Sequence, residues 1–489
     1  MNGKRFLAAV FAAITAAGVA AQVQPKVTAN DLKADVSFLA SDALEGRGTP
    51  SKSLDIAAEY IASEFRRAGL EPAGDDGYFQ TAPYASVTPN LDGLELTLET
   101  GDRVIKAESA SMGLQEAAAA DLSHVPAVKV TMTDAAALDA LTPDQVRGKV
   151  LLLVIPPDTQ YSVTRGIPDA IARLEPALVL SVRTHGRGLS AGPRLRDTSA
   201  PGAKVPILAV WDAAMQTAVA AAGEIRVSVH IPAPTAVPVR LRNVIGVLRG
   251  SDPALKDTYL VLTAHYDHLG VRGTGEGDHI YNGANDDASG TSSVIEIAKA
   301  FASLAQRPKR SIVFMTLFGE ELGDLGSRYY CQHPVFPLAK TIADINLEQL
   351  GRTDDNEGPR LLQFNLTGFD YTGIAAFLSK AGGETGIRVV KDEKNSDSFF
   401  ARSDNAAFAN AGIPSTTLSV SYIFPDYHRP GDEWPKLDYD NMARVDGAVA
   451  LGVFRMADSA EAPHWNKANP KTARYVQARE NAGTAAKSQ

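Results

Sequence analysis

Apolar strands and helical segments alternate along the second half of the chain, from Arg242 onward. Six runs have the continuous apolar character of buried strands: 244–248, 259–264, 311–317, 341–347, 361–365 and 415–420. Helical patterns separate them at about 288–305, 323–332, 369–381 and 439–457. This alternation predicts an α/β fold with a mixed, mostly parallel sheet and helices on both of its faces.

Two further helices are predicted near the N-terminus, at 29–40 and 51–69, and Gly69 can end the second of them. A glycine-punctuated loop, Leu44-Glu-Gly-Arg-Gly48, lies between them. These helices belong to residues 22–104, which we predict to be the N-terminal part of the same domain as residues 239–461.

The segment at 105–238 has a different character, with short β-rich runs, alanine-rich helical runs, and proline and glycine between them. Its three histidines, His124, His185 and His230, show no metal-ligand spacing. We therefore predict a separate, non-catalytic domain. Residues 462–489 are polar and lack periodicity, which predicts a flexible tail.

The first 21 residues have the layout of a secretory signal peptide. Lys4 and Arg5 precede a short apolar run, and small residues place a cleavage site before Gln22. An N-terminal membrane anchor is the alternative, although the run is too short for an ordinary spanning helix. The sequence thus predicts an exported protein, periplasmic or secreted, with no membrane span after the signal is removed.

The net charge and the cysteine content exclude some classes of binding partner and some kinds of metal site. The net charge of -9 argues against nucleic acid or an anionic membrane as a partner. Cys331 is the single cysteine, so the chain can form neither an intrachain disulfide nor a cysteine-based zinc site. A metal ion would have to be held by histidines and carboxylates.

Acidic residues and histidines follow the predicted strands. The strand at 259–264 runs into His265-Tyr-Asp267, where one side chain can bind a metal while the other orients it. Such a pair alone is more often an ordinary hydrogen bond. The strand at 311–317 leads to Glu320 and Glu321, and adjacent carboxylates can divide the roles of metal ligand and general base.

Three further motifs complete the set. Asp286 lies in Asn282-Gly-Ala-Asn-Asp-Asp-Ala-Ser-Gly290, which opens a predicted helix and could by itself be a helix cap. Glu348 follows the strand at 341–347, and His428 lies in the loop after the strand at 415–420. All candidates fall at the carboxyl ends of strands, the edge of an open α/β sheet where sites assemble. Two histidines and three carboxylates suit two zinc ions bridged by a carboxylate, although cobalt and manganese accept similar ligands.

These motifs, in this order, resemble the di-zinc aminopeptidase superfamily, which includes bacterial leucyl aminopeptidases, glutamate carboxypeptidase, glutaminyl cyclase and transferrin receptor. The resemblance covers residues 31–460 and implies the three-layer zinc exopeptidase fold. It also implies that the 105–238 segment is an inserted protease-associated domain.

The resemblance implies roles for each site residue. Asp286 would bridge two zinc ions, with His265 and Glu348 completing one site and Glu321 and His428 the other. The three predicted catalytic residues are the general base, the residue that orients the first histidine, and a residue that steadies the oxyanion: Glu320, Asp267 and Tyr427. The implied function is removal of N-terminal residues from peptides, with oligomeric state unspecified.

Two positions depart from the family pattern. Glu348 stands where Asp is usual, and Ser403-Asp-Asn405 replaces the common Ser-Asp-His. We interpret the second change as lying outside the metal ligands. His268 and His279 flank the site motifs. Contact with substrate is one alternative for them, but we predict that both are surface residues.

Other functions remain open from the sequence. A glutaminyl cyclase would use one zinc on a similar fold, and a binding protein without activity would lose ligands that are present here. A carboxypeptidase would need a basic cluster for the terminal carboxylate, for which Arg352, Arg402 and Arg429 are candidates.

Overall fold

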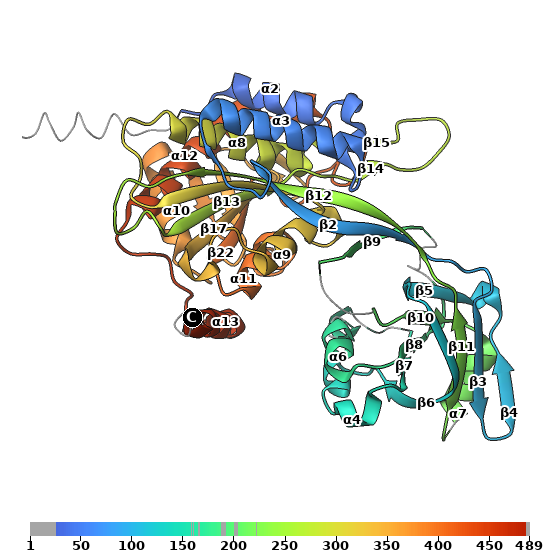
Figure 1. The fold of residues 1–489 in the computed structure, drawn as a ribbon. Coiled ribbons are helices and arrows are strands. Elements are labelled where there is room, and N and C mark those ends of the chain that lie inside the picture. The colour runs from blue at the N-terminus through green and yellow to red at the C-terminus, as the bar shows by residue number, and fades with distance from the viewer. Residues whose placement is uncertain are drawn as a thin grey trace, which may run out of the picture. The chain divides into compact units, whose positions relative to one another are not determined.

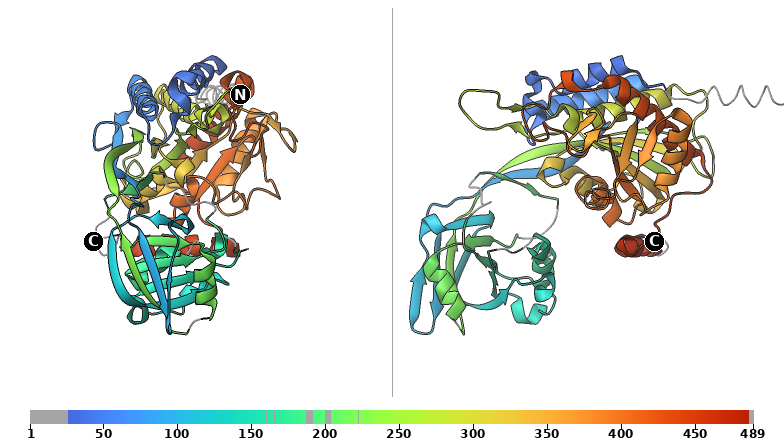
Figure 2. Two further views of the ribbon diagram at one scale, coloured as in Figure 1. Left: turned by 90° about the vertical axis from the view of Figure 1, so that its right-hand side faces the viewer. Right: turned by 180° about the vertical axis from the view of Figure 1, so that it is seen from behind.

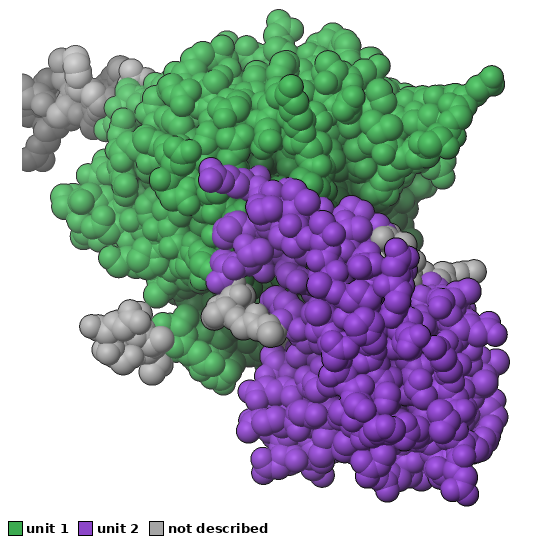
Figure 3. Space-filling model, turned by 45° about the vertical axis from the view of Figure 1, so that its right-hand side comes forward, with its two compact units in different colours: residues 1–82, 241–489 green, residues 83–240 purple. Residues whose placement is uncertain are grey.

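The computed structural model places most of the chain. It describes residues 26–157, 159, 161–164, 167–186, 192–199, 204–221 and 223–485. The predicted signal peptide lies outside these residues. Among the helices it does describe, none has the length and apolar character needed to cross a bilayer. The chain divides into two compact units, residues 1–82 with 241–489 and residues 83–240, coloured separately in Figure 3.

The first unit is built on the mixed, mostly parallel sheet that the sequence predicts. The order of its central strands is β21 (Arg388–Val390), β20 (Gln363–Leu366), β22 (Ser415–Ser419), β17 (Thr341–Leu347), β13 (Tyr259–His265), β16 (Ser311–Leu317) and β12 (Thr235–Leu248). β13 runs parallel to both β16 and β17, and β17 runs parallel to β22. Their carboxyl ends therefore meet at one edge of the sheet.

Helices cover both faces of this sheet, which gives three layers (Figures 1 and 2). On one side lie α2 (Ala29–Leu39), α3 (Lys52–Ala68), α8 (Ser289–Ala302), α10 (Ile374–Thr385) and α12 (Tyr439–Asp458). On the other lie α9 (Leu325–Gln332) and α11 (Asn405–Asn410), where Tyr330 and Phe408 pack on buried residues of the sheet. Burial on both faces explains why the central strands read as unbroken apolar runs.

Local signals set the ends of the N-terminal helices. Thr28 accepts a hydrogen bond from the backbone N–H of Asp31 at 3.2 Å, and Ser51 accepts one from that of Leu54 at 3.0 Å. Gly69 ends α3 with a φ of 76°, a left-handed conformation that glycine adopts without strain. The predicted end at Gly69 is therefore correct.

The second unit begins earlier than the predicted boundary at residue 105. It takes in β3 (Glu95–Thr100), because that strand pairs with β11 (Arg226–Ile231) along most of its length. The remaining strands of its sheet are β4 (Arg103–Lys106), β5 (Met112–Glu116), β6 (Ala120–Thr131), β7 (Val150–Val154), β8 (Leu178–Val182) and β10 (Ile207–Val210). Pairing between segments over 120 residues apart carries no signal in local composition.

The prediction of a flexible tail at 462–489 is wrong for most of that segment. Residues Ala473–Ala485 form helix α13. Trp465 and Tyr475 stack with ring centroids 4.9 Å apart and join a buried cluster with Tyr371 and Phe400. Two aromatic side chains thus attach a polar segment to the first unit.

A buried carboxyl between α8 and α12 predicts how stability depends on pH. Burial, with a smaller contribution from Glu296, raises the pKa of Asp446 to about 8, even though Ser293 donates a hydrogen bond to its carboxylate at 2.9 Å. The folded-state pKa lies above the unfolded value of about 4. The stabilising contribution is therefore complete below pH 4 and is lost as the pH rises to about 8.

Replacing Asp446 with an uncharged residue should prevent this loss of stability at high pH. We expect Asp446→Asn to be more stable than the unaltered protein at pH 8, by a few kcal/mol, because each pKa unit corresponds to about 1.4 kcal/mol. The gain should shrink toward pH 5. Urea unfolding of metal-free protein at the two pH values measures it, with the exposed Asp440→Asn on the same helix as control. An equal effect of Asp446→Asn at both pH values would contradict the prediction.

Candidate active site

The predicted site residues converge at the carboxyl edge of the sheet of the first unit. His265 is the last residue of β13, Glu348 directly follows β17, and Glu320 and Glu321 open a short turn after β16. His428 lies in the loop beyond β22 and has a φ of 55°. The ends of four strands therefore bring together side chains from a stretch of more than 160 residues, from His265 to His428.

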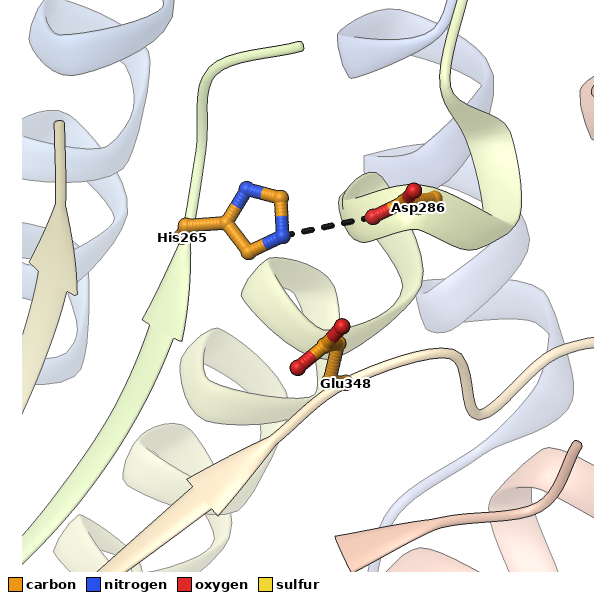
Figure 4. A group of neighbouring side chains, drawn as sticks. All are labelled: His265, Asp286 and Glu348. Carbon is orange, nitrogen blue, oxygen red and sulfur yellow. Dashed lines mark ion pairs between the residues drawn. The ribbon is translucent and has the colours of Figure 1, made fainter. Parts of the chain in front are cut away.

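Asp286 lies between two histidines. One of its carboxylate oxygens, Oδ1, is 3.3 Å from Nε2 of His265, and the other, Oδ2, is 3.1 Å from Nε2 of His428. His265, Asp286 and Glu348 form one group whose ligand atoms are mutually within 4.8 Å (Figure 4). The two oxygens of Asp286 thus face different partners, as a bridging carboxylate requires.

A second group of possible ligands consists of His268, Asp286 and Glu321. It includes His268, for which the sequence predicts a surface position. Glu321 Oε1 is 3.3 Å from Nε2 of His428 and 2.7 Å from Nδ1 of His268. His268 is 2% exposed, so the prediction of a surface residue is wrong for it. The reason is tertiary, because the ring packs against Gly283, where a Cβ atom would lie 2.4 Å from the ring. The available signal was a histidine three residues after His265, a candidate metal ligand at a strand end.

The backbone around Asp286 is held by two other carboxylates. Asp432 accepts hydrogen bonds from the backbone N–H groups of Asn285 and Asp286 at 3.0–3.1 Å. Asp287 accepts them from Gly290 at 2.9 Å and from Gln349 at 3.1 Å. The loop that carries Asp286 is therefore tied both to the His428 loop and to the segment after β17.

Arg47, in the loop between α2 and α3, connects the segments of the site through their backbones. Its fully buried guanidinium donates to the carbonyls of Tyr266 at 2.8 Å, Asn282 at 2.8 Å and Gly283 at 3.0 Å, and also to that of Leu39. Burial lowers its pKa to about 10, which still keeps it charged at neutral pH. The glycine-punctuated loop thereby supports the segments that present His265 and Asp286.

Asp267 joins the histidine strand to the two glutamates. Nδ1 of His265 is 3.2 Å from the backbone carbonyl of Asp267 and 3.6 Å from its carboxylate. The same carboxylate accepts the backbone N–H of Glu320 at 3.1 Å. Asp267 therefore lies where it can orient both His265 and the turn that carries Glu320.

Several buried carboxyl groups lie close together in the site, and their pKa values are shifted. Burial holds the pKa of Glu320 well above its usual range, and repulsion from Glu348 adds to the effect. Burial likewise raises the pKa of Glu348 to about 7. Burial would also raise the pKa of Asp286, but the close approach of the His265 and His428 rings outweighs this effect and lowers that pKa. Crowded carboxylates of this kind favour the binding of cations.

Two buried ligand atoms that lack hydrogen-bond partners also suit a zinc site. Nε2 of His265 and Oε1 of Glu321 are buried and make no hydrogen bond within the described part of the chain. Imidazole nitrogen and carboxylate oxygen are ordinary zinc ligands, and buried orphan atoms facing one another are costly without a partner. The residues present therefore fit two ions that share Asp286.

The remaining candidates occupy defined places. Tyr427 stacks on His428 with ring centroids 4.0 Å apart. Asn405 donates to the carbonyl of Phe400 and accepts from Thr417, so its side chain is engaged away from the ligand groups. His279 lies in a solvent-facing loop, with its ring 3.2 Å from the carbonyl of Gly275.

Comparison with known proteins agrees with this geometry. Residues 243–453, which contain all five predicted metal ligands, match the model of peptidase family M28. We call residues 243–453 the M28 segment. The M28 segment confirms the resemblance to the di-zinc aminopeptidase superfamily that the motifs indicated.

Individual relatives of the M28 segment are distant. The chain is 28% identical over 202 residues to a probable zinc metalloprotease of Leptosphaeria maculans, covering 41% of this chain and 44% of that protein. It is 24% identical over 239 residues to the aminopeptidase YwaD of Bacillus subtilis, covering 45% and 46%. The chain thus matches less than half the length of these curated relatives.

A solved structure supports the fold over a longer stretch. The aminopeptidase from Aneurinibacillus sp. strain AM-1 superposes with a TM-score of 0.54 at 19% identity, covering 90% of this chain and 97% of that one. This likeness confirms the α/β fold class.

Proposed function

We propose that the protein is an exported, zinc-dependent aminopeptidase that removes N-terminal residues from peptides. The observation that carries the proposal is the position of Asp286, whose two oxygens lie 3.3 and 3.1 Å from two different histidines. The M28 match and the aminopeptidase among the relatives support the same activity. Export rests on the character of the first 21 residues, and the second unit is proposed as a protease-associated domain.

His265, Asp286 and Glu348 would hold one zinc ion, and Asp286, Glu321 and His428 the other. When bound, the ions would lower the pKa of the attacking water and polarise the scissile carbonyl. Nδ1 of His268 lies 2.7 Å from Oε1 of Glu321, where it would help to orient that carboxylate.

Glu320 is placed to be the general base. It is the one acid of the Glu320–Glu321 pair that does not belong to a ligand group of the described chain. A raised pKa suits a carboxylate that takes a proton from water and returns it to the leaving amine. The Tyr427 hydroxyl, whose pKa burial raises, stays protonated and can donate a hydrogen bond to the oxygen of the tetrahedral intermediate.

A panel of substrates with and without chelator tests the function. We expect hydrolysis of aminoacyl amides with a free amine, no hydrolysis of acetyl-blocked counterparts, and about two zinc ions per chain by mass spectrometry. Removing the metal with a chelator should abolish turnover, and adding zinc should restore it. Cleavage of blocked substrates would overturn the aminopeptidase proposal, and cyclisation of N-terminal glutamine with one zinc would indicate a cyclase instead.

A further inference from the structure

A pocket adjoins the candidate metal site on the side of Glu348. The space between its lining residues, part of which is open to solvent, amounts to about 330 Å³. Glu348 and Tyr427 form the wall toward the metal groups, and the rest of the lining consists of Gln349, Thr367, Phe399, Arg402, Ser403, Thr417, Ser419 and Tyr422. A side chain in this pocket would belong to the substrate residue next to the bond being cleaved. The pocket is therefore placed to select that residue.

Two hydroxyl groups of the pocket lining can still donate a hydrogen bond to a ligand. Tyr422 is 5% exposed, and its hydroxyl has no hydrogen-bond partner among the described residues. Thr367 accepts the backbone N–H of Thr417 at 2.9 Å, which leaves its own hydroxyl proton available. A buried hydroxyl without a partner is costly, so a ligand that accepts hydrogen bonds would be favoured here.

Arg402 adds a positive charge to the same lining. Its guanidinium lies over the ring of Phe399, 4.4 Å from the ring centre, and Phe399 in turn stacks on Tyr422 at 5.0 Å. In the described part of the chain, no carboxylate lies within ion-pair distance of Arg402. Glu348 is the pocket's only acidic lining residue, and it belongs to a metal group. A planar guanidinium held on an aromatic ring is well suited to bind a carboxylate.

The other arginines considered for this task are differently placed. Arg352 is engaged by Asp354 at 2.6 Å and by Asp426 at 2.8 Å. Arg429 is exposed and does not line the pocket. Among the three, only Arg402 combines a free charge with a position beside the metal groups.

We propose that this pocket binds a carboxylate, and that its ligand is the acidic side chain of an N-terminal Asp or Glu of the peptide. This inference rests on the proposed aminopeptidase activity and adds a substrate class to it. Arg402 would pair with the carboxylate, while Tyr422 and Thr367 donate hydrogen bonds to it. Phe399 and Tyr427 would enclose the methylene groups of the side chain.

The test compares isosteric substrates. The protein, loaded with zinc, is assayed on aminoacyl coumarin amides of Glu, Gln, Asp, Asn, Leu and Lys. We expect kcat/KM for Glu to exceed that for Gln by roughly tenfold or more, since a charge-assisted pair distinguishes them. Arg402→Gln should lower kcat/KM for Glu and Asp by roughly 10- to 100-fold, mainly through KM, and leave Leu within about threefold.

Three further variants sharpen the comparison. Arg402→Glu should favour Lys over Glu, and Tyr422→Phe should reduce the Glu-to-Gln ratio. Arg444→Gln, an exposed arginine on α12 outside the pocket, should leave every ratio unchanged. Equal zinc content and thermal midpoints across the variants exclude misfolding as the cause.

Several outcomes would overturn the inference. A preference for Leu, with a Glu-to-Gln ratio that Arg402→Gln does not change, would do so while leaving the aminopeptidase proposal intact. Cleavage of acetyl-blocked peptides ending in Glu, lost in Arg402→Gln, would assign the pocket to a terminal carboxylate instead. If no substrate is hydrolysed, the proposed function fails, and calorimetric binding of free L-glutamate against L-glutamine still decides the pocket's ligand.

Discussion

Replacing Asp286 with alanine should remove both zinc ions and lower peptide hydrolysis below detection. The reason is that Asp286 is the one residue shared by the two ligand groups, with Oδ1 facing His265 and Oδ2 facing His428. Each ion would retain only two protein ligands, too few for a stable zinc site. Mass spectrometry of dialysed protein measures the zinc content, and hydrolysis of an aminoacyl amide measures the activity.

Variants at unshared ligands provide the matched comparison. Glu348→Gln should lose about one ion per chain and keep the other, because Glu348 belongs only to the group with His265 and Asp286. The exposed Asp440→Asn should retain both. Two ions bound in Asp286→Ala, or equal losses in Asp286→Ala and Glu348→Gln, would show that Asp286 does not bridge.

Replacing Glu320 with glutamine should lower kcat by roughly 10²- to 10⁴-fold, the usual contribution of a general base. The amide keeps the shape of the side chain but cannot accept the proton of the attacking water. Because Glu320 is outside both ligand groups, zinc content should remain at about two ions. KM should change little if the residue acts in the transition state.

A variant of the adjacent Glu321 provides the control for Glu320→Gln. Glu321→Gln should lose one ion, since Oε1 of Glu321 is 3.3 Å from Nε2 of His428, the other proposed ligand of that ion. Comparing the two variants separates loss of the base from loss of the metal. Near-normal turnover of Glu320→Gln at full zinc content would exclude Glu320 as the base.

The part of the fold that the sequence predicted well is the part built from local patterns. The strand predicted at 311–317 and that at 341–347 agree with β16 and β17, and helix α12 differs from its prediction by one residue. Strands buried on both faces are continuous apolar runs, so their limits can be read directly. The candidate metal ligands could be brought together by prediction for a related reason, because they lie at or beyond the ends of such strands.

Other features had no comparable signal. Helix α13 lacks a strong apolar face, and two aromatic residues, Trp465 and Tyr475, attach this segment to the first unit. The second unit starts at residue 83, well before the predicted boundary, and β3 within it pairs with a strand more than 120 residues later. Both depend on contacts between distant segments.

The sequence alone determined the class of chemistry, since one cysteine and a set of histidines and acids at strand ends left a metal held by nitrogen and oxygen ligands. The tertiary structure decided how these groups pair. It determined which oxygen of Asp286 faces which histidine and that His268 is buried against Glu321. It also determined that Arg352 forms ion pairs, whereas Arg402 has none with the residues that the structure describes. The physical reason is that ligand type follows from residue identity, whereas burial and pairing depend on segments that only folding brings together.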